Sequence, residues 1–347
     1  MTETGTELLE SYESRFMPYR SLTIVIACLS IPLNFFTMYI IMFKSPPHLS
    51  VYKYVLLNIS FWIFVTDFVL GFYYLPLPLL EIFGGIGTGL SYPLGPKGGF
   101  VGLVVDMSCV CESLAALLLA FVYRYLCISC GPDFIQKSGR RAYYWAGIVA
   151  IMVIPPGMTA ALTAMTYMSP EEFRKSILET HPDYVVFVDR TPVFGVNLKR
   201  KEWLVTILIW IFLCTTCVTM CIYNVVKELK MRQATMTSWT FRMHKQLMKA
   251  LTVQTGAPLL LFAAPASMVM ITAIFGARIM DDVVKLAEVA MSLHSIVNSV
   301  AVLYLITAYR RAVTAIFKKV LSCHINMTSV SVASQSLNVS TLNVVSL

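Results

Sequence analysis

Seven long apolar stretches dominate this sequence and leave few folds open to it. An α-helix rises 1.5 Å per residue, so about 20 mostly apolar residues cross about 30 Å of hydrocarbon. Stretches of this kind are residues 21–43, 54–80, 100–129, 143–168, 203–226, 247–275 and 286–308. A bilayer core offers no water to unpaired backbone groups, so each stretch must be helical. The sequence therefore predicts an all-α membrane protein, a seven-transmembrane helix bundle between residues 21 and 308.

The composition agrees with lipid as the solvent. Charged residues make up only 13% of the chain, against about 25% in a typical soluble domain. The net charge of +8 does not indicate a nucleic-acid partner, because Lys and Arg gather in short clusters between the apolar stretches. Clusters placed there suit the headgroups of membrane lipid. No paired CxxC motifs at zinc spacing occur, so we expect no metal site and no cofactor.

The distribution of basic residues predicts that the N-terminal segment, residues 1–20, is extracellular. In that orientation most Lys and Arg residues face the cytoplasm, as the positive-inside rule requires. The acids of the connecting segments agree, because only Asp133 and Glu228 then face inside. The cluster at residues 199–201 opposes this orientation, since its three basic residues would lie outside, just before the fifth stretch.

The remaining segments are a long connection and the C-terminal part. Residues 169–202 are polar around one short apolar run, for which we expect a β-hairpin lid. Residues 309–347 are expected to be cytoplasmic and to begin with a basic amphipathic helix that lies on the inner leaflet. A Ser/Thr-rich tail follows. Cys323, just beyond the helix, is either a lipidation site or an unmodified thiol.

Several short motifs follow one another along the apolar stretches. They are Ile31-Pro32-Leu33, Lys44-Ser45-Pro46-Pro47, the run YKYVLLN at 52–58, Tyr123-Arg124-Tyr125, the run FRMHKQL at 241–247, Leu293-His294 and Ala308-Tyr309-Arg310. Together they resemble the nematode serpentine chemoreceptors, most closely class H (Srh), with the sibling classes Sri and Str sharing several motifs. The resemblance runs from about residue 21 to residue 311. It implies a G-protein-coupled receptor with a small-molecule odorant or pheromone-like ligand and a heterotrimeric G protein as partners.

The sequence departs from ordinary rhodopsin-like receptors. Tyr123 stands where those receptors carry an acid before the Arg-Tyr pair, and no Asn-Pro-x-x-Tyr ends the seventh stretch. Residues 169–202 contain no cysteine, so the usual disulfide between the third helix and the second outer connection cannot form. Residues 286–308 contain no lysine, which argues against a retinal Schiff base.

Charged residues inside a membrane are costly and therefore mark candidate sites. Asp67, Asp106 and Glu112 lie inside apolar stretches, and counting along the helices predicts that Asp67 and Asp106 are at similar depth in the outer half. Each is either part of a ligand or cation site or a packing residue. His294 in the seventh stretch could bond across the bundle or sense protons, or simply pack.

The cytoplasmic candidates are basic. Arg124 ends the third stretch, where an arginine either pairs with the sixth helix at rest and meets a G protein on opening, or anchors the helix end. Further candidates for G-protein contact are Arg242, Lys245, Lys249 and Arg310. We expect a receptor of the cell membrane, in sensory cilia for example, and no enzyme, because no nucleophile–base motif is found. A seven-helix channel or transporter is the alternative.

Overall fold

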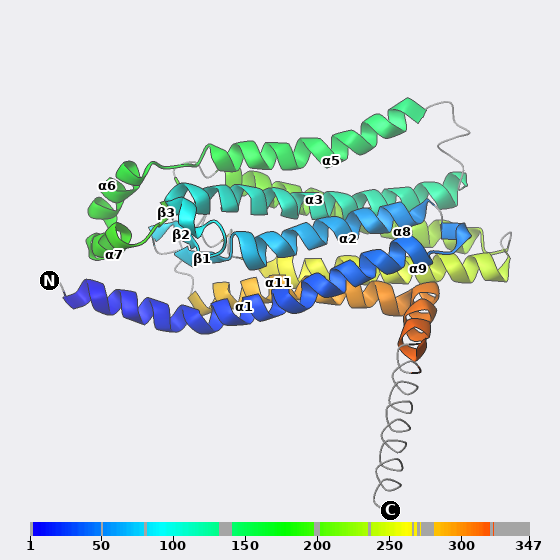
Figure 1. The fold of residues 1–347 in the computed structure, drawn as a ribbon. Coiled ribbons are helices and arrows are strands. Elements are labelled where there is room, and N and C mark those ends of the chain that lie inside the picture. The colour runs from blue at the N-terminus through cyan, green and yellow to red at the C-terminus, as the bar shows by residue number, and fades with distance from the viewer. Residues whose placement is uncertain are drawn as a thin grey trace, which may run out of the picture.

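The chain folds into a bundle of long helices that run along one axis (Figure 1). The computed structural model describes residues 3–49, 51–79, 82–131, 141–197, 202–234, 237–265, 267–268, 271, 281–319 and 322. The bundle consists of α1 (Glu3–Lys44), α2 (Tyr52–Phe68), α3 (Gly95–Cys130), α5 (Arg141–Ala164), α8 (Glu202–Met231), α9 (Ser238–Pro258) and α11 (Asp281–Leu305). Within the described residues, six helices are long and apolar enough to cross a membrane. The remaining expected span, 247–275, corresponds to α9 and the π-helix η6 (Leu259–Ala263).

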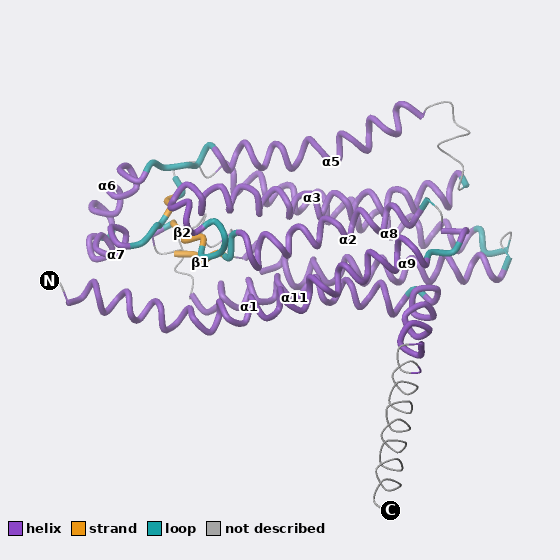
Figure 2. Tube along the Cα trace, viewed as in Figure 1, coloured by secondary structure: helices purple, strands orange, loops and turns teal. Residues whose placement is uncertain are grey.

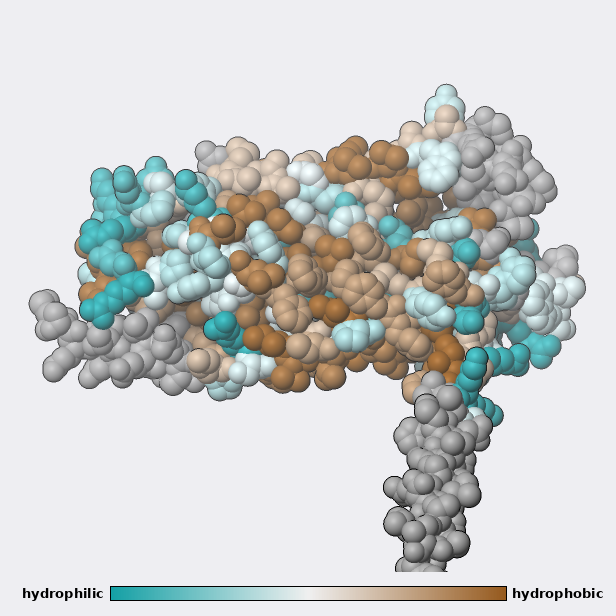
Figure 3. All heavy atoms as spheres, in the orientation of Figure 1, coloured by the Kyte–Doolittle hydropathy of each residue, from teal (hydrophilic) through white to brown (hydrophobic). Residues whose placement is uncertain are grey.

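The outer surface of the bundle has the polarity that a bilayer requires. Figure 3 shows apolar residues over the middle of its length and hydrophilic residues toward both ends. Large apolar side chains are exposed along α5 and α8, among them Val149, Ile154, Ile209 and Phe212. Exposed apolar side chains along a whole helix would be unfavourable in water, whereas lipid accepts them.

Helix α2 does not continue as a regular helix to residue 80. It passes into the π-helix η2 (Val69–Tyr73), and the Tyr74 N–H donates to the Val69 carbonyl at 2.7 Å. The chain then extends into strand β1 (Pro76–Leu79), because Pro76 and Pro78 lack the N–H that a helix needs. The π-turn directs Tyr74 onto α3, where a Cβ built on Gly102 would lie 2.5 Å from the Tyr74 ring. Only glycine allows this close approach.

A small antiparallel sheet closes the end of the bundle at which the chain begins (Figure 2). Strand β2 (Gly84–Gly87) pairs with β1 on one side and with β3 (Phe194–Gly195) on the other. The connection between α2 and α3 is thereby joined to the connection between α5 and α8. The prolines of β1 stand on an edge strand, where a missing N–H is tolerated.

The expectation of a β-hairpin within residues 169–202 was wrong. Helix α6 (Pro170–Thr180), the short turn η5 (Pro182–Tyr184) and helix α7 (Val185–Arg190) occupy most of this segment. Ser169 and Glu172 form a reciprocal capping box at the start of α6, a signal that the sequence already contained. Arg174 binds Asp189 through two hydrogen bonds of 2.7 and 3.0 Å, which joins α6 to α7. The Arg174 guanidinium holds the pKa of Asp189 below its usual value.

A buried polar network joins three helices of the bundle. Asn34 of α1 is fully buried; its Nδ2 donates to Ser295 Oγ at 2.7 Å and to Asp67 Oδ2 at 3.4 Å. Ser299 Oγ donates to Asn34 Oδ1 at 2.7 Å. Asn34 therefore holds α1, α2 and α11 together at one level.

Replacing Asn34 by Ala should destabilise the helix bundle. The change leaves buried polar groups on three helices unsatisfied, at a cost of about 1–3 kcal/mol. The thermal midpoint of the detergent-purified protein should fall, whereas Asn224→Ala, an exposed position on α8, should leave it unchanged. Equal midpoints for both variants would contradict the structural role of the network.

After α11 the chain changes direction. Residues 307–319 form a helix that turns away from the bundle axis (Figure 1). Ala312, Val313 and Ile316 pack against the inner cluster around Tyr309, while its basic residues are exposed. This is the arrangement expected of an amphipathic helix on a membrane surface. Cys323 lies outside the described residues.

Candidate functional site

Two buried carboxylates, one on α3 and one on α11, lie in the part of the bundle next to the small sheet. Asp106 of α3 is only 5% exposed, and its Oδ1 has no hydrogen-bond partner. Glu288 of α11 is also buried and accepts a hydrogen bond from the Tyr19 hydroxyl of α1. The charges of the two acids interact, and the buried Tyr74 lies within range of both. The end of the bundle that carries the small sheet thus holds two interacting acids, called the acid pair here, on α3 and α11.

The sequence analysis identified Asp106 but overlooked Glu288 and Tyr19. Glu288 lies inside the predicted span 286–308, so the rule that selected Asp106 could have found it as well. Tyr19 was placed in the extracellular segment 1–20. In the structure α1 begins at Glu3, and its continuous helix brings Tyr19 against α11.

Asp67 belongs to a different group. It lies in the network of Asn34 and Ser295, and its charge interacts with His294. Thr66 Oγ1 and Ser113 Oγ are 3.2 Å apart, which places Asp67 level with Ser113. Seven residues of helix, or about 10 Å, separate that level from Asp106.

The expectation that Asp67 and Asp106 lie at similar depth is therefore wrong. The count started at residue 54 for Asp67 and at residue 100 for Asp106, and it assumed that about 30 Å separate these two ends. In the structure regular helix stops earlier in α2 and begins earlier in α3, at Gly95. His294 is 4% exposed, and its Nδ1 contacts the Met291 carbonyl of its own helix. Asp67 and His294 thus have partners inside the bundle.

Glu112 lies between these two levels on α3. Its Oε2 has no hydrogen-bond partner, although the side chain is only half-buried. The nearest interactions are with Cys109 and Cys111 of the same helix. Glu112 does not join the acid pair. Among the described residues, no three metal-ligating side chains form a cluster.

Arg124 is buried at the inner end of α3. It is 4% exposed, and its guanidinium carbon stands 3.4 Å from the centre of the Tyr52 ring of α2. Tyr52 in turn stacks on Tyr123, with ring centroids 6.1 Å apart. The Nε and Nη2 of Arg124 have no hydrogen-bond partner. A cation–π contact of this kind contributes up to about 2 kcal/mol when desolvated.

The expected pairing of Arg124 with the sixth helix takes an unexpected form. Its neighbour on α9 is His244, three residues before the predicted span 247–275, and no acid of α9 faces it. Burial and the Arg124 charge lower the pKa of His244 to about 4. His244 is therefore neutral at neutral pH and does not repel Arg124.

The other basic candidates lie on the surface around this end. Arg242, Lys245 and Lys249 are exposed on α9, and Arg310 is exposed just after α11. Arg242 Nε donates to the Ser238 carbonyl at 3.2 Å, and Arg310 stands 5.6 Å from the Tyr304 ring. None of the four is buried beside Arg124. They surround the inner end of the bundle as separate cations.

Long helices with apolar outer surfaces and charged groups buried between them define a multi-pass helical membrane protein. The description "Serpentine type 7TM GPCR chemoreceptor Srh" matches residues 17–319, which is most of the chain. The chain belongs to this family of serpentine chemoreceptors. This confirms the resemblance to class H, the seven-helix membrane fold and the expectation of a receptor rather than an enzyme.

A curated relative comes from a sibling class. Serpentine receptor class J-38 of Caenorhabditis elegans is 24% identical over 226 residues, which cover 61% of this chain and 66% of that receptor. The chain thus spans just under two thirds of the length of the relative. The two sequences share the serpentine receptor type and differ at most aligned positions.

Proposed function

We propose that this receptor binds a small molecule at the Asp106–Glu288 pair and signals to a heterotrimeric G protein. The observation that carries the proposal is the unpartnered Oδ1 of Asp106, which is buried beside a second acid. A buried polar atom without a partner costs about 1–3 kcal/mol. A ligand that donates a hydrogen bond or carries a positive charge, such as a protonated amine, would remove this cost.

The inner end supports the signalling part of the proposal. Arg124 lies against Tyr52 with two nitrogens, Nε and Nη2, that have no hydrogen-bond partner, while His244 of α9 lies close by. Displacement of α9 would open Arg124 to carbonyl or carboxylate acceptors on a G protein. The exposed cations of α9 and Arg310 would contact the same partner.

The proposed orientation has an extracellular N-terminus and a cytoplasmic C-terminus in the plasma membrane. The acid pair then faces the outside half and Arg124 the cytoplasm, as a receptor for external chemicals requires. Epitope tags at the two ends should be stained differently in intact cells, with antibody reaching only the N-terminal tag. Staining of both tags or of neither, with both visible after permeabilisation, would refute this orientation.

The function is tested by an agonist screen in cells that report cAMP, cGMP or calcium. Sensory cilia are the proposed site of action. Because the acid pair favours a cationic ligand, volatile and water-soluble amines are the first compounds to test. At least one compound should raise the signal in receptor-expressing cells and leave untransfected cells silent. An agonist whose response persists when G-protein activation is blocked would contradict the coupling.

A further inference from the structure

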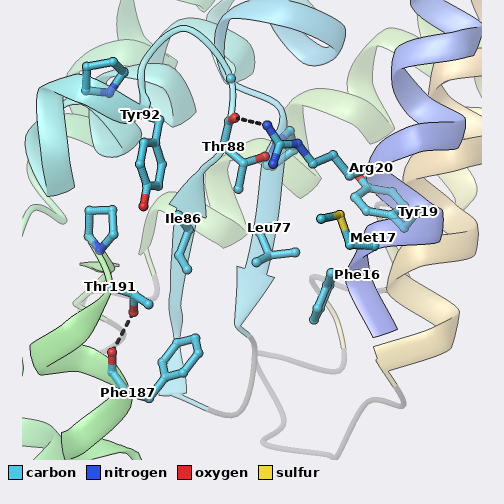
Figure 4. A pocket seen from close by; sticks show the side chains of 14 residues that line it. Phe16, Met17, Tyr19, Arg20, Leu77, Ile86, Thr88, Tyr92, Phe187 and Thr191 are labelled. Carbon is cyan, nitrogen blue, oxygen red and sulfur yellow. Dashed lines mark hydrogen bonds between the residues drawn. The ribbon is translucent and has the colours of Figure 1, made fainter. Parts of the chain in front are cut away.

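A pocket of about 530 Å³ opens at the outer end of the bundle, above the acid pair. Its walls are residues 16–20 of α1, the β1–β2 hairpin and the segment around α7 (Figure 4). Small-molecule sites commonly enclose about 300–1,000 Å³. The pocket therefore has room for a ligand of its own.

Most of the lining is apolar. Phe16 and Met17 come from α1, Leu77 and Ile86 from the two hairpin strands, and Phe187 from α7 (Figure 4). Phe16 and Phe187 are largely buried against their neighbours, so the walls are formed by packed side chains. Such walls favour an apolar ligand body.

Arg20 supplies the only charge among the described residues that line the pocket. Its Nη2 donates to the Thr88 carbonyl at 3.3 Å, and it forms no ion pair with a described residue. A guanidinium has five N–H donors, so most remain available. The nearby acid Glu288 is buried and does not line the pocket, and it accepts a hydrogen bond from the hydroxyl of Tyr19, which does.

We propose that this pocket binds an amphiphile that has one anionic head at Arg20 and an apolar body along Leu77, Ile86 and Phe187. The source of such a molecule is either a dissolved organic acid or an anionic lipid of the leaflet on the N-terminal side. The shared chemistry is an anion joined to a hydrocarbon. This site is distinct from the acid pair, whose chemistry selects a cation, and the proposal does not depend on it.

The test uses the full-length receptor in phosphatidylcholine nanodiscs with radiolabelled decanoate as the probe. Binding should saturate, and unlabelled decanoate should compete far better than decyltrimethylammonium or decanol. Arg20→Gln should weaken binding about tenfold, because a charge-assisted hydrogen bond is lost. Arg20→Lys should restore most of it, and Leu77→Trp should block the pocket. Lys97→Gln, an exposed cation outside the lining, is the matched control.

A second arm identifies the source of the amphiphile. Nanodiscs that contain photoactivatable phosphatidylglycerol should show labelling of α1 or the hairpin, lost in Arg20→Gln, if the occupant is a lipid. Decanoate binding without such labelling would support a dissolved acid. Binding that is indifferent to head charge and to Arg20→Gln, or absent together with lipid labelling, would overturn the proposal. Asp106→Asn should bind decanoate like the wild type, so failure at the acid pair is seen separately.

Discussion

Replacing Asp106 by Asn should abolish the agonist response while leaving the amount of receptor at the cell surface unchanged. The side chain keeps its size, but the negative charge that would meet a cationic ligand is gone. Truncating one member of a buried charged pair costs about 2–5 kcal/mol, which corresponds to a loss in agonist affinity of at least about 30-fold. The dose–response curve of the agonist found in the reporter screen measures this loss.

The matched control for Asp106 is Asp183→Asn. Asp183 is an exposed acid of the turn η5 at the same end of the receptor, outside the bundle. Its removal should leave the dose–response curve in place, which separates a local site from a general loss of negative charge. An unchanged curve for Asp106→Asn at normal surface expression would remove Asp106 from the ligand site.

Replacing Arg124 by Ala should uncouple the receptor while ligand binding persists. The agonist site lies toward the other end of α3, whereas Arg124 has its unpaired N–H groups at the inner end. Loss of its hydrogen bonds to a G protein should lower agonist-stimulated nucleotide exchange about tenfold or more. GTPγS binding to a reconstituted G protein and agonist binding to the same sample measure the two properties side by side.

Lys227→Ala is the control for Arg124. Lys227 is an exposed cation near the inner end of α8, so its removal changes the charge without disturbing the Tyr52 contact. Coupling should remain near the wild-type level in this variant. Full nucleotide exchange in Arg124→Ala would show that Arg124 only anchors the helix end.

Hydropathy alone predicted the bundle because the length of an apolar run and the thickness of a bilayer are linked by the helical rise. Asp106 and Arg124 were found in the same way, as charges within apolar stretches. The relative depth of Asp67 and Asp106 was not, since it depends on the start of α3 at Gly95 and on how far this 36-residue helix extends beyond the assumed bilayer thickness. Neither feature has a period that hydropathy detects.

Which side chains contact one another was harder to predict than where each residue lies along its helix. That Arg124 stacks on Tyr52 and lies beside His244 depends on how α2, α3 and α9 pack, and no local pattern encodes that packing. The pocket beside Arg20 also depends on how distant segments pack, because Arg20, Leu77 and Phe187 come from three separate segments of the chain. Glu288 is the exception, since it is a charged residue within a predicted span, and the rule that selected Asp106 applies to it as well.

The small sheet at the outer end has a consequence for how this receptor opens. In β2 and β3 only Gly84 and Gly85 face Gly195 and Phe194, and no cysteine occurs in the second outer connection to tie it down covalently. The two connections are therefore held together without a covalent bond, by a few backbone hydrogen bonds and by a buried apolar cluster that joins Ile82 and Ile86 to Phe173 and Phe187. Such contacts separate and re-form without any redox chemistry, so the apolar packing and the short ladder together oppose a separation of the two connections.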